Sequence, residues 1–324
     1  MNLVPLPEWA PHQAVWIGFP SAADLWLEDL APAQSEVAAF AAAIHADGAG
    51  EEAWLVAADD KAAAEARRLA PFARVIVEPF GDIWLRDTGA IVLGGGPGRR
   101  AQGFGFNGWG GKYELEGDDS IGERLAAEAG LPHSKSDWIL EGGAIDGDGS
   151  GTFITTEQCL LNPNRNPGFD KDEVEERLKR DLGATRVVWL GDGLLNDHTD
   201  GHVDNLARFI ASNRVAIPEA TTDDPNAQAY ADAAEALLDA DLEVVAIPSP
   251  GTVERDGEII PASYMNFYIG NATVVVPLYG APNDGAAVDA IQSLFPDRKV
   301  VGLRADHILT GGGSFHCISQ QVPA

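Results

Sequence analysis

Three segments of this chain share one pattern, and that repetition constrains the fold more than any other feature of the sequence. They are GGAIDGDGSGTFITTEQCLLNPN, VDNLARFIASNRVAIPEA and MNFYIGNATVVVPLYG. Each predicts a short strand, a tight turn with Gly, Ser or Asn, and an apolar strand that ends at Pro or Asn. Extended stretches around Trp84 and Cys317 add two similar units, and five units of about 65 residues would fill the 324-residue chain.

Helical patterns lie between the apolar runs, so strands and helices alternate. Amphipathic segments predict helices at 32–45, 60–69, 120–129, 171–182, 226–240 and 284–294. Apolar runs bounded by turn residues predict strands at 14–18, 53–57, 75–77, 91–93, 186–190 and 243–247. The repeat favours a radial α/β architecture with sheets around an axis, as in a propeller, and an open α/β sheet is the alternative. No long linker divides the chain, so we expect a single catalytic domain over residues 1–324.

The charge balance limits the partners. Fifty acidic and 22 basic residues give a formal net charge of -28. This charge repels phosphate backbones and anionic lipid, so we expect neither nucleic acid nor membrane as a partner. The uncharged run 259–283 contains Asn, Gly and Pro and predicts two buried strands around a turn. The negative charge would attract a small cation, or would only keep the protein in solution.

The two cysteines are too few for a disulfide framework, which favours a reducing compartment. The opening residues MNLVPLPEWAPHQ have neither the basic nor the apolar stretch of a secretory signal. We therefore expect a cytoplasmic location. The sequence leaves the oligomeric state open, a homo-oligomer included.

Four clusters place reactive or charged side chains beside glycine, where a loop can approach a ligand closely. They are DIWLRDTG (82–89), LEGGA (140–144), NDHTDGHVDN (196–205) and GGGSFHC (311–317). Together they supply a thiol, a histidine and three carboxylates without a lysine. Such a set suits a cation with several N–H donors.

Cys317 is the candidate nucleophile. It follows a triple glycine and His316, which offer backbone N–H groups, an exposed turn and an imidazole that could favour the thiolate. The alternative for any free cysteine is a small buried hydrophobe. That alternative fits Cys159, because TTEQCLLN is a strand pattern.

His198 and His202 allow two interpretations. Four residues apart, they would share one face of a helix and could bind zinc, but Gly201 and the surrounding aspartates disfavour a helix and no HExxH glutamate is present. If His202 and Asp204 lie on a strand instead, both side chains point to the same face. One histidine and one carboxylate would then line one site.

Asp87 and Glu141 each come just before a glycine turn. Either carboxylate could bind a cationic ligand. The alternative for Asp87 is a turn cap or a local pair with Arg86, and a similar structural role is open to Glu141.

The motifs taken together are similar to a known family. DxWxRDxG, FNGWGGKY, LEGGxI, TTExCLLNPNRNP, GHVDN and GGGSxHCISQQ occur in this order between residues 82 and 321, after the opening PEWAPHQAVWIGFP. They resemble the agmatine deiminase and bacterial peptidylarginine deiminase family over essentially the whole chain. The resemblance implies the guanidine-modifying fold, a five-bladed pseudo-symmetric α/β propeller of ββαβ units with the active site on its axis.

The resemblance also implies the role of each residue. The family's nucleophile corresponds to Cys317, its general acid/base to His202, and its guanidinium-binding carboxylates to Asp87 and Asp204. Glu141 matches the carboxylate that orients the histidine in related enzymes. The implied reaction is hydrolytic deimination of a small cationic guanidinium substrate through a covalent amidino-cysteine, with no cofactor and no metal.

Agmatine is the substrate that fits best, and N-carbamoylputrescine would be its product; arginine in a peptide and free arginine are the alternatives. Free arginine would need a cationic clamp for its carboxylate, and the motifs offer only Arg86. Trp84 and Trp109 are candidate walls for an aliphatic cation, although both could belong to the core.

The substrate's distal ammonium has no obvious acceptor at the expected position. The family pattern has Asp four residues before the histidine, where this chain has His198. Asp197 or Asp200 could take the ammonium instead. Outside the family, the alternatives are a metal-dependent amidine hydrolase that uses His198 and His202, and a polyamine-binding protein without turnover.

Overall fold

The computed structural model describes residues 3–255 and 257–324. Within them the strands form five sheets of three or four strands and one two-stranded sheet. In order across each sheet, they are β18 (Ser319–Pro323), β1 (His12–Phe19), β2 (Glu52–Ala57) and β3 (Arg74–Val77); β4 (Ile91–Leu93), β5 (Arg100–Gly105) and β6 (His133–Ile139); β7 (Ile145–Gly147), β8 (Thr152–Thr155) and β9 (Arg186–Trp189); β10 (Arg208–Ala211), β11 (Arg214–Glu219) and β12 (Glu243–Pro248); β15 (Tyr268–Ile269), β16 (Thr273–Leu278) and β17 (Lys299–Arg304); and β13 (Glu254–Arg255) with β14 (Glu258–Ile259).

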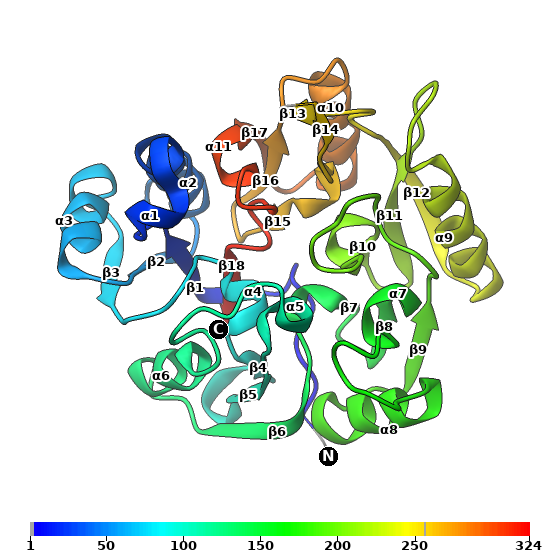
Figure 1. The fold of residues 1–324 in the computed structure, drawn as a ribbon, viewed down its shortest axis with the longest axis horizontal. Coiled ribbons are helices and arrows are strands. Elements are labelled where there is room, and N and C mark those ends of the chain that lie inside the picture. Colours follow the sequence, from blue (N-terminus) through cyan, green and yellow to red (C-terminus); the bar gives the residue numbers. More distant parts are fainter. Residues whose placement is uncertain (1–2, 256) are drawn as a thin grey trace.

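The five larger sheets repeat one pairing scheme. In each, the first two strands are antiparallel and the next pair is parallel. A parallel pair needs a crossover, and a helix supplies it in every case. These helices are α2 (Leu30–His45), α3 (Asp60–Leu69), α6 (Ile121–Glu128), α8 (Lys171–Leu182), α9 (Ala227–Asp239) and α10 (Asp284–Leu294). The predicted α/β class is confirmed, and Figure 1 shows the sheets around the middle of the molecule with the helices mostly toward its outside.

Each of these helices begins and ends within two residues of the bounds that the sequence patterns predict. The Asp170 side chain accepts from the Glu173 N–H at the start of α8, and Gly183 ends that helix in the left-handed conformation. Acidic residues lie in the first turn of α8 and basic residues in the last, which favours the helix dipole. All six predicted helices and all six predicted strands are present.

One expected strand is wrong. The pattern TTEQCLLN predicts an extended segment, but β8 ends at Thr155 and a one-turn helix, α7 (Glu157–Leu160), follows. The Thr156 hydroxyl accepts the Cys159 N–H and caps this helix. A local capping bond therefore outweighs the strand pattern of the apolar residues.

The turns that precede the first strand of each large sheet lie together. They are α4 (Leu85–Thr88) before β4, η4 (Gly142–Ala144) before β7, η5 (Val203–Asn205) before β10, η6 (Tyr264–Asn266) before β15, and residues 311–317 before β18. Neighbouring turns contact one another, and α4 also contacts β18. Each large sheet is thus preceded by one short turn, and these turns lie in the same central region.

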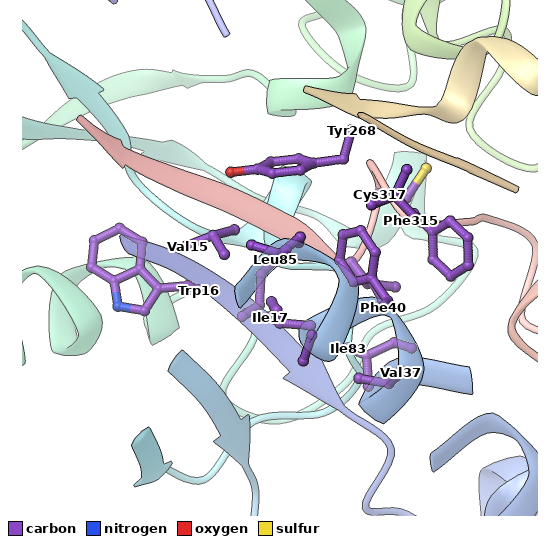
Figure 2. Packing of buried hydrophobic residues seen from close by; sticks show 14 of the residues in the cluster. Val15, Trp16, Ile17, Val37, Phe40, Ile83, Leu85, Tyr268, Phe315 and Cys317 are labelled. Carbon is purple, nitrogen blue, oxygen red and sulfur yellow. The ribbon is translucent and has the colours of Figure 1, made fainter. Parts of the chain in front are cut away.

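A buried apolar cluster holds the last of these turns in place. Figure 2 shows Phe315 beside Phe40 of α2, with Val15 and Ile17 of β1 nearby. The rings of Phe40 and Phe315 stack with centroids 4.7 Å apart. Removing a buried phenylalanine ring costs about 3–5 kcal/mol, so this packing anchors the loop that carries Cys317.

The uncharged run 259–283 forms β15 and β16 around a turn, as predicted. No helix among the described residues has the length and apolar character needed to span a bilayer.

Candidate active site

A cavity of about 180 Å³ opens beside the central turns. Four aromatic side chains line it, namely Trp26, Trp84, Trp109 and Tyr113. Asp87 and Cys317 also line it, and none of the described residues on its wall is Lys or Arg. Asp82 is a second carboxylate on the wall, so the cavity joins aromatic surface to two carboxylates and a thiol.

Cys317 is 5% exposed and lies two residues before β18. Its Sγ accepts from Asn266 Nδ2 at 3.0 Å and lies 3.6 Å from Asp204 Oδ2. Burial and the negative charges of Asp204 and Asp87 raise the pKa of Cys317 well above its usual value. The cysteine is therefore a neutral thiol while the cavity holds no cation.

Asp87 lies on the one-turn helix α4 and is held at both carboxylate oxygens. Oδ1 accepts from the Gly143 N–H at 2.9 Å, and Oδ2 accepts from Trp109 Nε1 at 3.0 Å. A Cβ added at Gly143 would lie 2.8 Å from Asp87 Oδ1, so only glycine lets this backbone approach so closely. Burial raises the pKa of Asp87.

Asp204 lies in η5 and belongs to a buried chain of charged groups. Its Oδ2 is 2.7 Å from His316 Nδ1, and His316 Nε2 is 2.9 Å from Glu8 Oε2. Burial by itself raises the pKa of Asp204, but the hydrogen bond and charge of His316 outweigh it and hold that pKa below its usual value. Oδ1 of Asp204 has no partner among the described residues. Asp204 is therefore an ionised carboxylate next to the Cys317 thiol, and one of its oxygens makes no hydrogen bond to the described residues.

His202 lies beside Asp87, with its Nδ1 3.7 Å from Asp87 Oδ1, and is not among the residues that line the cavity. Burial by itself lowers the pKa of His202, but the Asp87 and Glu141 carboxylates and Cys159 outweigh it and hold that pKa well above its usual value. The imidazole is therefore protonated near neutral pH. Glu141 is fully buried and accepts from Arg165 Nε at 2.7 Å through Oε1.

Of the five residues expected to contact substrate, three line the cavity and two do not. Trp84, Trp109 and His198 line the cavity, and Tyr113 Oη lies 3.2 Å from His198 Nδ1. Asp197 and Asp200 do not line it.

Both aspartates bond elsewhere. Asp197 accepts from the backbone and hydroxyl of Thr199, while Asp200 pairs with Lys112 and Arg165. The expectation that one of them lies at the substrate's ammonium is wrong, because local turn bonds and ion pairs turn both away from the cavity.

Three further expectations are corrected. His202 and Asp204 do not share a strand, because Asp204 lies in the turn η5. The His316 ring does not face the Cys317 thiol, because it bonds Asp204 and Glu8 instead. Cys317 is buried rather than on an exposed turn, although it reaches the cavity.

The region around His198 and His202 is not a helix, as the sequence predicts. Asp200 and Gly201 have φ values of 62° and 85°, in the left-handed region. The two histidines consequently do not share a helix face, and the zinc interpretation loses its geometric basis.

Sequence reasoning missed Asn266 and Gly143. Asn266 Oδ1 accepts the His316 N–H at 3.0 Å, while its Nδ2 reaches Cys317 Sγ. Both residues stand just before the first strand of a repeated segment, in the same place as Asp204. Superposing the three similar segments would have identified them.

Residues 5–323 match the model of the Porphyromonas-type peptidyl-arginine deiminase family. The chain belongs to that family. Agmatine deiminase of Stutzerimonas stutzeri is 39% identical, over 98% of this chain and 94% of that protein.

Solved structures give the same result. Agmatine deiminase of Enterococcus faecalis superposes with a TM-score of 0.93 at 33% identity, covering 99% of this chain and 96% of that one. A cysteine-to-serine variant of C. jejuni agmatine deiminase with substrate bound has a TM-score of 0.89 at 27% identity, covering 100% and 97%. The chain is therefore a hydrolase that acts on carbon–nitrogen bonds of linear amidines.

Proposed function

We propose that this protein is an agmatine deiminase, which converts agmatine and water to N-carbamoylputrescine and ammonia through a covalent amidino-cysteine. The observation that carries the proposal is the arrangement of Asp87 and Asp204 around the Cys317 thiol, beside an aromatic cavity without Lys or Arg among its described lining residues. A planar cation with several N–H donors is the ligand that such a site favours.

Binding and activation of the nucleophile are coupled in this proposal. Asp87 and Asp204 accept N–H groups of the guanidinium and hold its plane against Sγ. The bound cation offsets the negative charge that raises the pKa of Cys317. The thiol therefore releases its proton to solvent when substrate binds and reacts as the thiolate, whereas the resting enzyme keeps an unreactive thiol.

His202 moves the protons. Sγ attacks the guanidinium carbon, and the carbon–nitrogen bond breaks as protonated His202 gives its proton to the departing ammonia. The neutral imidazole then takes a proton from water, whose oxygen attacks the same carbon. The carbon–sulfur bond breaks, the hydroxyl proton passes to solvent, the urea leaves, and the thiolate returns. Glu141, held by Arg165, is the group we assign to orienting His202.

The character of the cavity favours agmatine over free arginine. An α-carboxylate needs a cationic partner, and Arg86 bonds Glu8 and Gln321 rather than lining the cavity. Trp84 and Trp109 offer apolar faces to a four-carbon chain. Relatives at 33–39% identity carry the name agmatine deiminase. Arginine in a peptide is the second candidate, because the matched family is described as peptidyl-arginine deiminase.

We also propose that residues 1–324 form one catalytic domain built as a five-bladed propeller of ββαβ units. Five sheets with the same pairing scheme, each with a turn at the common centre, support this arrangement. A cytoplasmic location, a homo-oligomer and the lack of nucleic acid or membrane partners stay predictions.

The deciding experiment measures ammonia release from agmatine, arginine and a blocked arginyl amide. Agmatine should have the highest kcat/KM, iodoacetamide should abolish turnover, and a chelator should not. Cys317→Ser should abolish turnover in a folded protein, because an alcohol scarcely ionises near neutral pH. Cys159→Ser is the matched control and should turn over, since Cys159 does not line the cavity. Chelator-sensitive activity, or the opposite behaviour of the two variants, would contradict the proposal.

A further inference from the structure

A second thiol, that of Cys159, lies close to His202 in the interior. Cys159 on α7, Glu141 before η4 and His202 before η5 come from separate turns, and each is at most 1% exposed. One donor atom of each residue lies within 4.8 Å of the other two. A thiol, a carboxylate and an imidazole therefore meet in the interior.

Two of these residues have buried polar atoms that make no hydrogen bond. Among the residues the structure describes, the two ring nitrogens of His202 make no hydrogen bond, and Oε2 of Glu141 makes none either. Arg165 binds only the other oxygen of Glu141. Unpaired buried polar atoms are rare, because each costs about 1–3 kcal/mol. Both residues lie in the same buried group as the Cys159 thiol, and such a grouping of donors is a feature of a binding site.

We infer that Glu141, Cys159 and His202 form an inhibitory site for Zn²⁺. Thiolate sulfur, imidazole nitrogen and carboxylate oxygen are the donors that Zn²⁺ takes, at about 2.0–2.3 Å from the ion. A tetrahedral set at those lengths separates its donors by about 3.5 Å, so side-chain rotations of about 1 Å would close the site. Cys159 loses its proton on binding, and with Glu141 it balances the charge of the ion.

The inhibition rests on the proposed function, whereas the binding does not. Zn²⁺ at this site occupies a ring nitrogen of His202 and removes its proton transfer. Cys317 and Asp87 keep their places in the cavity, so substrate still binds. We therefore expect Zn²⁺ to lower kcat much more than it raises KM. Zn²⁺ bound at Cys317 would instead compete with substrate.

The chain has two cysteines, which makes the binding test unambiguous. In Cys317→Ser, the remaining thiol is Cys159, so Co²⁺ bound at the inferred site should give a sulfur-to-cobalt charge-transfer band. Zn²⁺ should displace the cobalt and bleach the band. The double variant Cys317→Ser/Cys159→Ser should show no band. A Cys317→Ser protein that binds Co²⁺ without the band, or not at all, would overturn the inference.

The inhibition test uses enzyme that retains Cys317. Zn²⁺ should inhibit the wild type reversibly, with activity restored by a chelator, and Cys159→Ser should need at least ~10-fold more Zn²⁺ for half inhibition of its own uninhibited rate. Equal sensitivity of the two proteins, or inhibition that agmatine relieves competitively, would place the ion at Cys317 and overturn the inference. If agmatine proves not to be a substrate, the cobalt titration still tests the site, so the two failures are distinguishable.

Discussion

Replacing Gly143 by alanine should disable the active site while the fold persists. A Cβ at this position would lie 2.6 Å from His202 Nδ1, 2.8 Å from Asp87 Oδ1 and 3.2 Å from Asp204 Oδ2. The Gly143 backbone itself is compatible with alanine, since its φ lies outside the left-handed region. The conflict is therefore with three proposed catalytic side chains rather than with backbone geometry.

The expected magnitude follows from those distances. Ordinary contacts of a Cβ with nitrogen or oxygen are about 3.4 Å or longer, so His202 and Asp87 must each move by roughly 0.6–0.8 Å. A displacement near 1 Å of a reacting group lowers rates about 100-fold, equivalent to about 2.7 kcal/mol. Overpacking costs a further 1–3 kcal/mol of folding free energy, which would lower Tm by a few degrees in a chain of this size.

The assay is kcat/KM for agmatine by ammonia release, with Tm measured on the same samples. Gly285→Ala is the matched control, because Gly285 is in the first turn of α10 with no atom within 4 Å of an added Cβ. It should keep wild-type activity and gain up to about 1 kcal/mol of stability. A Gly143→Ala enzyme with kcat/KM within threefold of wild type would refute the reasoning about this close approach.

Asp87→Asn and Asp204→Asn should each lower kcat/KM for agmatine at least ~100-fold, because an amide presents donors to a donor-rich cation; near-normal steady-state kinetics would leave that aspartate a structural role. His198→Asp should raise the ratio of kcat/KM for agmatine to that for a blocked arginyl amide about fivefold, since it puts a carboxylate on the cavity wall, and a constant or lower ratio would show that residue 198 does not face the distal amine. Burial raises the pKa of Asp118 to about 7, so the folded protein holds a proton that the unfolded chain releases near pH 4, and stability should fall by about 4 kcal/mol as pH rises from about 3 to 8. In Asp118→Asn, the free energy of unfolding from denaturant titrations should differ less between pH 5 and pH 8 than in the wild type. An equal difference in both proteins would contradict the prediction.

Local patterns in the sequence determined the secondary structure and the chemistry-bearing motifs. Helices such as α8 follow from capping residues and from an apolar face, both of which act within a few residues. The repeated segments predicted the hairpins that begin the sheets, and the glycine-flanked clusters contain Asp87, Asp204 and Cys317, which the structure brings to one centre. α7 was missed because one hydroxyl at Thr156 decides it against the apolar pattern.

Only the tertiary structure decided how these motifs meet. His316 bonds Glu8, which is 308 residues away, and so turns from the thiol beside it toward Asp204. The sequence pattern predicts that Cys159 is an ordinary core residue. In the structure it lies close to His202, which is 43 positions later in the chain. Asp200 lies among acidic motif residues but pairs with Lys112, 88 positions earlier. Residue type and local spacing specify an element and the chemistry of its side chains. The donors and charges that come within 3 Å of one another depend on how five separate sheets pack their turns together. That packing joins residues far apart in the chain, so no local pattern predicts it.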